Sequence, residues 1–191
     1  TIERLIHHVV DHREFEILKA PDKRRFRTEE CLSSPAIAGY RSAILNFIVG
    51  GCMQRSLEIK QGTPPRTLRY SFLVHSEAAK GSHSYQEKIT NELCKSLTAT
   101  AAAAKEPFQS LVEQAYRDIS ASLELAGKEV PPLSEVIEDV RTALTQGYIT
   151  IVKVNSDEQV ASMLDSTGQL KHRSPMNIFI GGQVLDRGVT L

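Results

Sequence analysis

The sequence has no net charge, few cysteines and no stretch typical of a membrane span. Lys and Arg total 23, as do Asp and Glu, which argues against a histone-like or tail-type nucleic-acid binder but leaves room for a local basic patch. The three cysteines, Cys31, Cys52 and Cys94, are odd in number and widely spaced, so neither a disulfide framework nor a zinc knuckle is indicated. No apolar run reaches the length of a bilayer span, and the N-terminus lacks the layout of a signal peptide. We therefore expect a soluble protein of the reducing cytoplasm, with no membrane partner.

Motifs that would identify an enzyme are also scarce. The P-loop pattern G-x-x-x-x-G-K-[ST] is absent, since neither VGGCMQRS (49–56) nor AAKGSHS (78–84) matches it. His8 and His12 are spaced for one face of a helix, but no H-E-x-x-H pattern accompanies them, so we expect no metal site. His75 stands alone at a predicted strand end, where a histidine is more often structural than catalytic. The sequence therefore offers no phosphate cradle of the P-loop kind and no obvious base that would activate water.

The first thirty residues combine apolar and basic side chains. HREFEILKAP (12–21) alternates apolar and charged residues, which predicts a short strand closed by Pro21. The following DKRRFRTEE (22–30) is predicted to be a loop or first helical turn and holds the densest basic cluster of the chain. A solvated surface explains such a cluster more often than a phosphate contact does.

A helix is predicted over 33–56. Ser34 suits the N-cap and Pro35 the first helical position, and apolar residues recur at helical spacing behind them. The pair Gly50-Gly51 is expected to weaken the far end of this helix.

The rest of the chain alternates strands and helices. Compact apolar stretches predict strands at 70–75, at 148–157 and at 177–180, and a helix is expected from about Tyr85. The block 98–147 is helical almost throughout. It is divided into three pieces by Pro107 and Pro131-Pro132, with Gly127 and Gly147 at C-cap positions.

This order predicts an α/β fold with a mostly parallel sheet and helices on both of its faces. We expect a strand and loop segment at 1–32, a sheet-bearing lobe formed by 33–97 and 148–191, and a helical insertion at 98–147. The chain lacks an initiator methionine and ends in an unusual glycine-rich stretch, so both ends are expected to be cut from a longer protein.

Small and polar residues follow each of the three predicted strands. In an open α/β sheet, ligands gather at the carboxyl ends of the strands. If the strands are parallel neighbours, one rim is shared by His75, Ser76, Asn155, Ser156, Gly181, Gly182 and Gln183. The segment 155–157 is equally well explained as a turn and helix cap.

The last strand leads into IGGQVLDRG (180–188). Glycines here allow main-chain N–H groups to approach a phosphate closely. Asp186 and Arg187 either contact such a ligand or form a structural pair that holds the turn.

Four stretches, in order, resemble one family. NIFIGGQVLDRGVTL resembles motif V in the C-terminal RecA-like lobe of superfamily-two helicases and translocases, closest to the helicase-like domain of restriction- and phage-defence-associated putative endonucleases. RYSFLVHSEAAKGSH and ITIVKVNSD are similar to earlier strands of that lobe, and SSPAIAGYRSAILNFIVGGCMQR resembles the helix that opens it. The resemblance covers residues 33–191 and implies an incomplete RecA-like lobe.

The resemblance also implies a mechanism. Such a lobe faces an N-terminal lobe, absent from this sequence, that carries the P-loop and binds Mg; ATP lies in the cleft between the lobes, and DNA or RNA lies across both. The residues carried over as coupling residues are Gly181, Gly182, Gln183, Arg187, Gly188 and Thr190. The family's Thr-Asp pair near Gly182 and its acidic residue near Thr190 are missing here, which puts a ribose contact by Thr190 in doubt.

Two classes of function remain open from the sequence. The first is the second motor lobe of an ATP-dependent helicase or translocase, inactive as an isolated chain. The second is a non-catalytic helicase-like binding or regulatory module. A further alternative is part of a DNA endonuclease in a defence system with other subunits. The sequence contains no paired-carboxylate-plus-lysine nuclease core.

Overall fold

The computed structural model describes residues 9–75, 80–154 and 174–182. The first described element is helix α2 (His12–Lys19), so the predicted strand at 12–21 is wrong. Asp11 caps the helix by accepting a hydrogen bond from the backbone N–H of Arg13 at 2.7 Å. Glu14 and Leu18, one helical turn apart, are its buried residues, so the inward face follows a helical period and not the alternation of a strand.

Helix α3 (Ala38–Lys60) follows two short 3-10 turns, η1 (Thr28–Glu30) and η2 (Pro35–Ile37). Ser34 accepts a hydrogen bond from the N–H of Ala36 at 3.3 Å and so caps the 3-10 turn η2, whereas the α-helix that it was predicted to cap begins later, after Ile37. The predicted weakening at Gly50-Gly51 is wrong, because the helix continues to Lys60. A Cβ at Gly51 would lie 3.4 Å from Met176 Sδ, so this glycine lets the helix pack closely on the sheet.

The remaining elements largely follow the predicted order. They are η3 (Pro65–Thr67), β1 (Tyr70–Val74), α4 (Lys80–Ala102), α5 (Phe108–Leu125), α6 (Leu133–Thr145), β2 (Ile149–Val154) and β3 (Met176–Gly181). Helix α4 begins before the predicted Tyr85. Pro107 and Pro132 directly precede α5 and α6, and Gly127 and Gly147 have φ of +65° and +69°, as expected of glycines that end helices. The sequence EQVASMLDS (158–166) has the pattern of a short amphipathic helix and lies outside the described residues.

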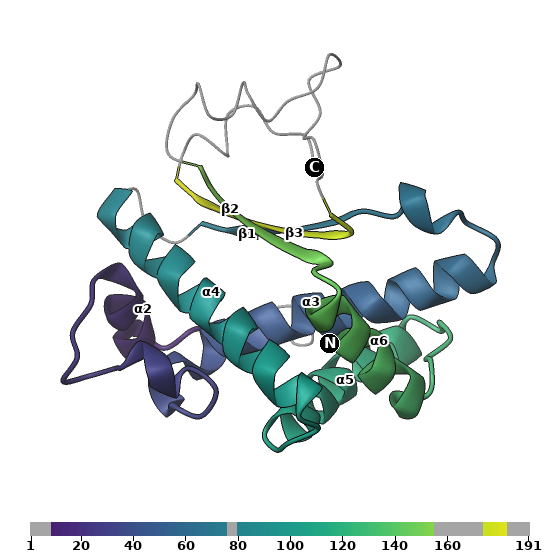
Figure 1. The fold of residues 1–191 in the computed structure, drawn as a ribbon, viewed down its shortest axis with the longest axis horizontal. Helices are drawn as coiled ribbons and strands as arrows, with labels where there is room; N and C mark the ends of the chain where they lie inside the picture. The colour runs from purple at the N-terminus through teal and green to yellow at the C-terminus, as the bar shows by residue number, and fades with distance from the viewer. Residues whose placement is uncertain (1–8, 76–79, 155–173, 183–191) are drawn as a thin grey trace, which may run out of the picture.

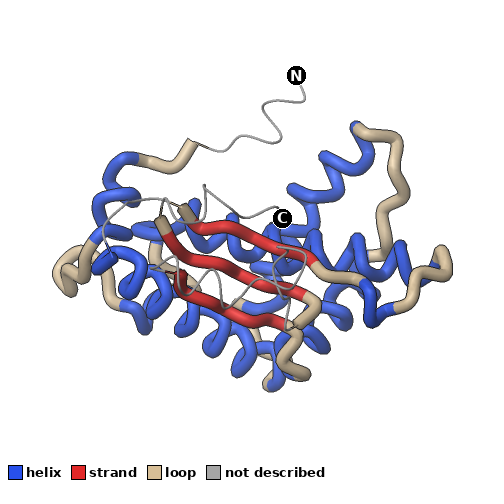
Figure 2. The backbone as a smooth tube through the Cα atoms, turned by 90° about the horizontal axis from the view of Figure 1, so that it is seen from above, coloured by secondary structure: helices blue, strands red, loops and turns tan. Residues whose placement is uncertain are grey.

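The sheet contains three described strands in the order β1-β3-β2, and both pairings are parallel. The last described strand is therefore the central one of these three (Figures 1 and 2). All six residues of β3 are buried, whereas the edge strands β1 and β2 are half-buried except for their last residues. An α/β fold with a parallel sheet is confirmed.

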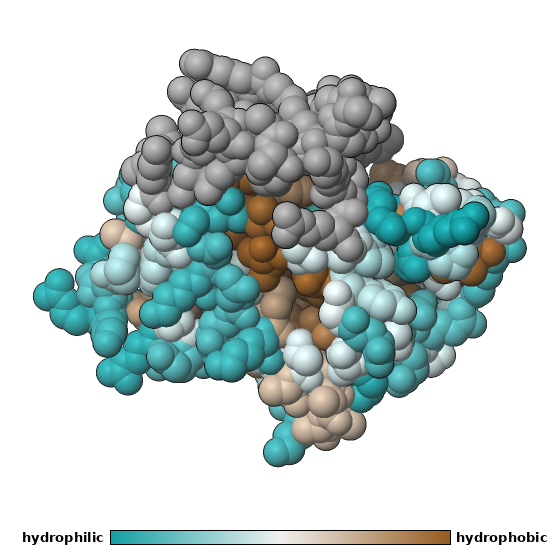
Figure 3. Space-filling model, turned by 45° about the horizontal axis from the view of Figure 1, so that its top comes forward, coloured by the Kyte–Doolittle hydropathy of each residue, from teal (hydrophilic) through white to brown (hydrophobic). Residues whose placement is uncertain are grey.

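The α-helices lie on one side of the sheet (Figure 1). Helical cover of the opposite face, which the sequence also predicted, is not seen in the part of the chain that the structure describes. Figure 3 shows an apolar strip in the middle of the molecule between hydrophilic surfaces, and the half-buried residues of β2 are mostly β-branched and apolar.

Helices of the block 98–147 share one hydrophobic core with α3, α4 and the sheet. Val112 of α5 and Val140 of α6 are fully buried in the same cluster as Ile48 of α3 and Ile178 of β3. Helix α5 packs on α3, and α6 packs on both α3 and α4. These helices therefore belong to the layer that supports the sheet.

One described helix, Pro35–Lys60, is long and apolar enough to cross a membrane by length and composition alone, which corrects the expectation that no stretch reaches this length. Half of its apolar window is buried inside the protein. The core helix of a soluble protein passes the same test, so this observation is weak evidence for a membrane span.

Candidate functional site

The candidate site is the edge of the sheet at which all three strands end. Val74 pairs with Ile180, and Val154 pairs with Gly181, so the carboxyl ends of the strands are level with one another. The residue after β1, His75, is exposed at this edge. Such an edge is where open α/β sheets bind ligands.

Gly181 and Gly182 occupy the centre of the edge. Gly181 ends β3 and Gly182 follows it, and both are buried. Because β3 lies between β1 and β2, the glycine pair lies between the ends of the two neighbouring strands. Glycine leaves its backbone uncovered by a side chain.

Lys153 is a residue of this edge that the sequence analysis missed. It is the penultimate residue of β2 and pairs with Ile180 of the central strand. Its Nζ lies 2.7 Å from Oε2 of Glu87 and 3.3 Å from Oγ of Ser84, both on α4. The Lys153 and Glu87 side chains are 27% and 31% exposed, so the ammonium is positioned by α4 yet reaches solvent. It is the one charged residue in the strand ITIVKV, and that feature of the sequence could have identified it.

The family comparison covers the part of the chain that builds this edge. The model of the Z1 domain matches residues 40–191, which include all three strands. The chain belongs to the Z1 domain family. Comparison with curated proteins finds no match, and comparison with solved structures finds none either. Helix α2 lies before the matched Z1 region, yet it packs against α4 within it.

Of the predicted site residues of this Z1 domain, the structure brings His75, Gly181 and Gly182 to one edge. The others lie outside the described residues: Ser76, Asn155, Ser156, Gln183, Arg187, Gly188 and Thr190. Their roles stay predictions.

Two polar side chains near the start of α4, those of His83 and Gln86, are buried and not part of the open edge. His83 and Gln86 are 2% and 1% exposed. Nε2 of Gln86 donates a hydrogen bond to the backbone carbonyl of Leu18 at 3.3 Å, which ties α4 to α2. Within the described residues, no group of three or more His, Cys, Asp or Glu side chains could hold a metal ion.

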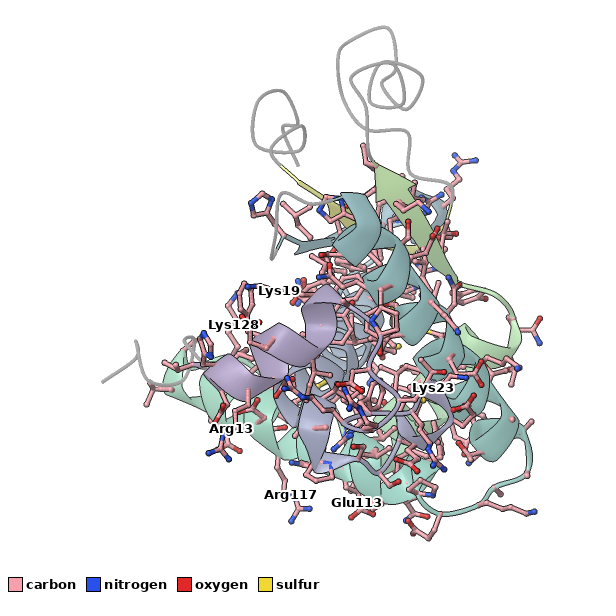
Figure 4. The ribbon with its side chains drawn as sticks, turned by 90° about the vertical axis from the view of Figure 1, so that its left-hand side faces the viewer. Arg13, Lys19, Lys23, Glu113, Arg117 and Lys128 are labelled. Carbon is pink, nitrogen blue, oxygen red and sulfur yellow. The ribbon has the colours of Figure 1, made fainter. Side chains whose placement is uncertain are left out.

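The basic cluster at 22–30 lies in the loop after α2. Figure 4 looks onto this side of the Z1 domain chain, with Arg13 and Lys19 on α2, Lys23 in the loop and Arg117 on α5. Asp22 lies 3.3 Å from Nε of Arg24 and 3.6 Å from Nε of Arg25. Hydrogen bonds from the Arg24 backbone and side chain lower the pKa of Asp22. This carboxylate offsets part of the cluster's charge, as expected of a solvated surface.

Proposed function

We propose that this Z1 domain is the second motor lobe of a nucleic-acid-dependent ATPase and couples ATP hydrolysis to binding of DNA or RNA. The observation that carries the proposal is the glycine pair Gly181-Gly182 at the end of the central strand, level with the ends of both neighbours. The sequence that continues from this pair resembles the coupling motif V of superfamily-two helicases and translocases. A RecA-like identity for the lobe is part of this proposal.

The chemistry expected of the edge is contact with phosphate. Because glycine has no side chain, the backbone at Gly181 and Gly182 can come close to an anionic oxygen in this proposal. The ammonium of Lys153 adds a positive charge at the same edge, and its ion pair with Glu87 fixes its position. Arg187 and Thr190 follow in the sequence and are the further coupling residues of the proposal.

ATP and Mg belong to a partner lobe in this proposal. The sequence contains no P-loop, so the residues present do not form a nucleotide-phosphate cradle on their own. The proposed partner is an N-terminal RecA-like lobe of the same protein, in the cytoplasm, together with further subunits of a defence system. The isolated chain is expected to lack ATPase activity, and measurable ATP hydrolysis by the purified chain would contradict this part of the proposal.

Nucleic-acid binding is tested by fluorescence anisotropy with a labelled single-stranded oligonucleotide, measured over a series of salt concentrations. Each lost phosphate contact lowers the dependence of log K on log salt by about one. We expect this reduction in Arg187→Ala and in Lys153→Met. The matched control is Lys95→Met, because Lys95 is 77% exposed and lies farther along α4.

A third substitution tests the direction of the effect. Glu87→Gln removes the carboxylate beside Lys153 without shortening the side chain, so binding is expected to become tighter and its salt dependence steeper. If Lys153→Met and Glu87→Gln leave the slope equal to that of Lys95→Met, Lys153 is not a phosphate contact. If Arg187→Ala also leaves the slope of log K against log salt unchanged, the edge does not bind nucleic acid.

A further inference from the structure

A cavity of about 270 Å³ lies at the opposite end of the strands from the proposed nucleic-acid edge. It is enclosed by α3, by α6 and by the amino ends of β2 and β3. It suits one or two fused rings and is too small for a whole nucleoside triphosphate.

The interior of this cavity is apolar. Cys52, Ala143 and Met176 line it and are between 0% and 3% exposed, and the ring of Tyr148 forms a further part of the wall. A flat ring inserted here would bury its faces against sulfur atoms, a methyl group and an aromatic ring. These contacts favour an aromatic ligand over a sugar or a phosphate.

Most polar groups of the lining already have protein partners. Nζ of Lys60 lies 2.7 Å from Oε2 of Glu135. Nη1 of Arg55 donates to the backbone carbonyl of Pro65 at 2.8 Å, and its guanidinium lies 5.9 Å from the centre of the Tyr148 ring. Both cations are therefore engaged outside the apolar interior.

Asp139 is the one carboxyl group among these lining residues. This half-buried carboxyl accepts a hydrogen bond from Ser56, but no ion pair within 4.0 Å joins it to a cation in the part of the chain that the structure describes. Burial is the largest cause of its raised pKa, and Glu135 adds to it. A carboxyl group in this setting retains acceptor capacity and gains from a ligand that donates to it.

We infer that this cavity binds a flat nitrogen heteroaromatic that carries an amino group, with Asp139 as the residue that recognises the amino group. An amino group beside a ring nitrogen offers one donor and one acceptor side by side. The ionised carboxylate accepts from the donor, and the protonated carboxyl also donates to the ring nitrogen. Adenine is a probe of this class, and purine is its counterpart without the amino group. This site lies apart from the proposed motor edge and does not depend on the proposed function.

The test is a titration of the isotope-labelled chain with adenine and with purine, followed by the backbone amide signals of residues around the cavity. Adenine is expected to cause saturable shifts there and to bind at least about fivefold more tightly than purine, because purine has no amino group to donate to the Asp139 carboxyl. Asp139→Ala is expected to remove this preference. Glu138→Ala is the matched control, because Glu138 is the neighbouring acid of α6, 68% exposed and directed to Arg141.

A second variant keeps the test decisive if Asp139→Ala is poorly folded. Thr142 lines the cavity from an exposed position on α6, so Thr142→Phe fills the opening without disturbing the core. Loss of the adenine shifts in this variant, with shifts retained in Glu138→Ala, supports the site. The inference is overturned if adenine causes no saturable shifts up to its solubility limit, if purine binds equally well, or if the shifts persist in Thr142→Phe.

Discussion

Replacing Glu14 by alanine should destabilise the whole chain, although Glu14 lies far from every candidate site. Helix α3 has no side-chain cap of its own, since the residue at its N-cap is Ile37. The carboxylate of Glu14, on α2, supplies the missing acceptor. Its Oε2 accepts from the N–H of Gly39 at 3.0 Å and its Oε1 accepts from the N–H of Tyr40 at 2.5 Å. These are the second and third helical positions, where a capping side chain normally binds.

The magnitude follows from the burial and charge of the contact. Glu14 is 7% exposed, and hydrogen bonds to a charged group contribute about 1.5–3 kcal/mol each. Water can enter the space that alanine leaves and can solvate part of the helix end, so the two bonds do not count in full. We expect Glu14→Ala to lower the free energy of unfolding by about 2–4 kcal/mol. In a domain of this size each kcal/mol corresponds to about 2–4 °C in Tm.

The assay is urea unfolding followed by circular dichroism, with Glu16→Ala as the matched control. Glu16 is on the same helix, its side chain is 38% exposed, and its partner is Lys19 at 2.7 Å. An exposed pair of this kind contributes at most about 1 kcal/mol. If Glu14→Ala costs no more than Glu16→Ala, the capping argument is refuted. A chain that begins at residue 40, where the Z1 match begins, should lose more stability than Glu14→Ala, because it also lacks buried core residues such as Leu18 and Phe26.

Two further predictions concern the packing and titration of α3. Gly51→Ala should leave the free energy of unfolding unchanged or slightly raised. Gly51→Val should lower it by about 1–3 kcal/mol, because the extra methyl groups meet Met176. Equal urea midpoints for these two variants would contradict this. Burial raises the pKa of Tyr40 from 10.0 to about 12. The folded state therefore favours the neutral form of the Tyr40 side chain. The stability that this preference contributes is complete below about pH 10 and is lost as the pH rises towards 12. Tyr40→Phe loses the hydrogen bond to Thr90 at 2.7 Å, which costs about 0.5–1.5 kcal/mol at neutral pH, but its stability should fall less steeply between pH 10 and 12. A fall as steep as that of the unmodified chain would contradict this cause.

The failed prediction at 12–21 has an identifiable cause. Alternation of apolar and charged residues normally separates a buried face from a wet one. In HREFEILK the charged Glu14 points inward, because it caps another helix. Its partner Gly39 is 25 residues away, and no local pattern contains that information.

The candidate site was predictable in one respect and not in another. Apolar runs and the helices between them were enough to predict a parallel sheet, and a parallel sheet brings the strand ends to one edge. The pair formed by Lys153 with Glu87 depends on how α4 packs beside β2. Periodicity specifies which face of an element is buried, but it does not specify which neighbour the exposed end of a long side chain meets.

The strand order has a consequence for how the chain is assembled during synthesis. Tyr70 of β1 pairs with Met176 of β3, and β2 finds its only described strand partner in β3 as well. The ribosome therefore releases both outer strands and all the described helices before the strand that joins them. Helical contacts are local and form early, whereas a parallel pairing over this sequence distance closes late. A nascent chain halted before residue 176 would hold a formed helical layer beside two strands without the strand partner that the structure describes for them, a state in which chaperone capture is expected.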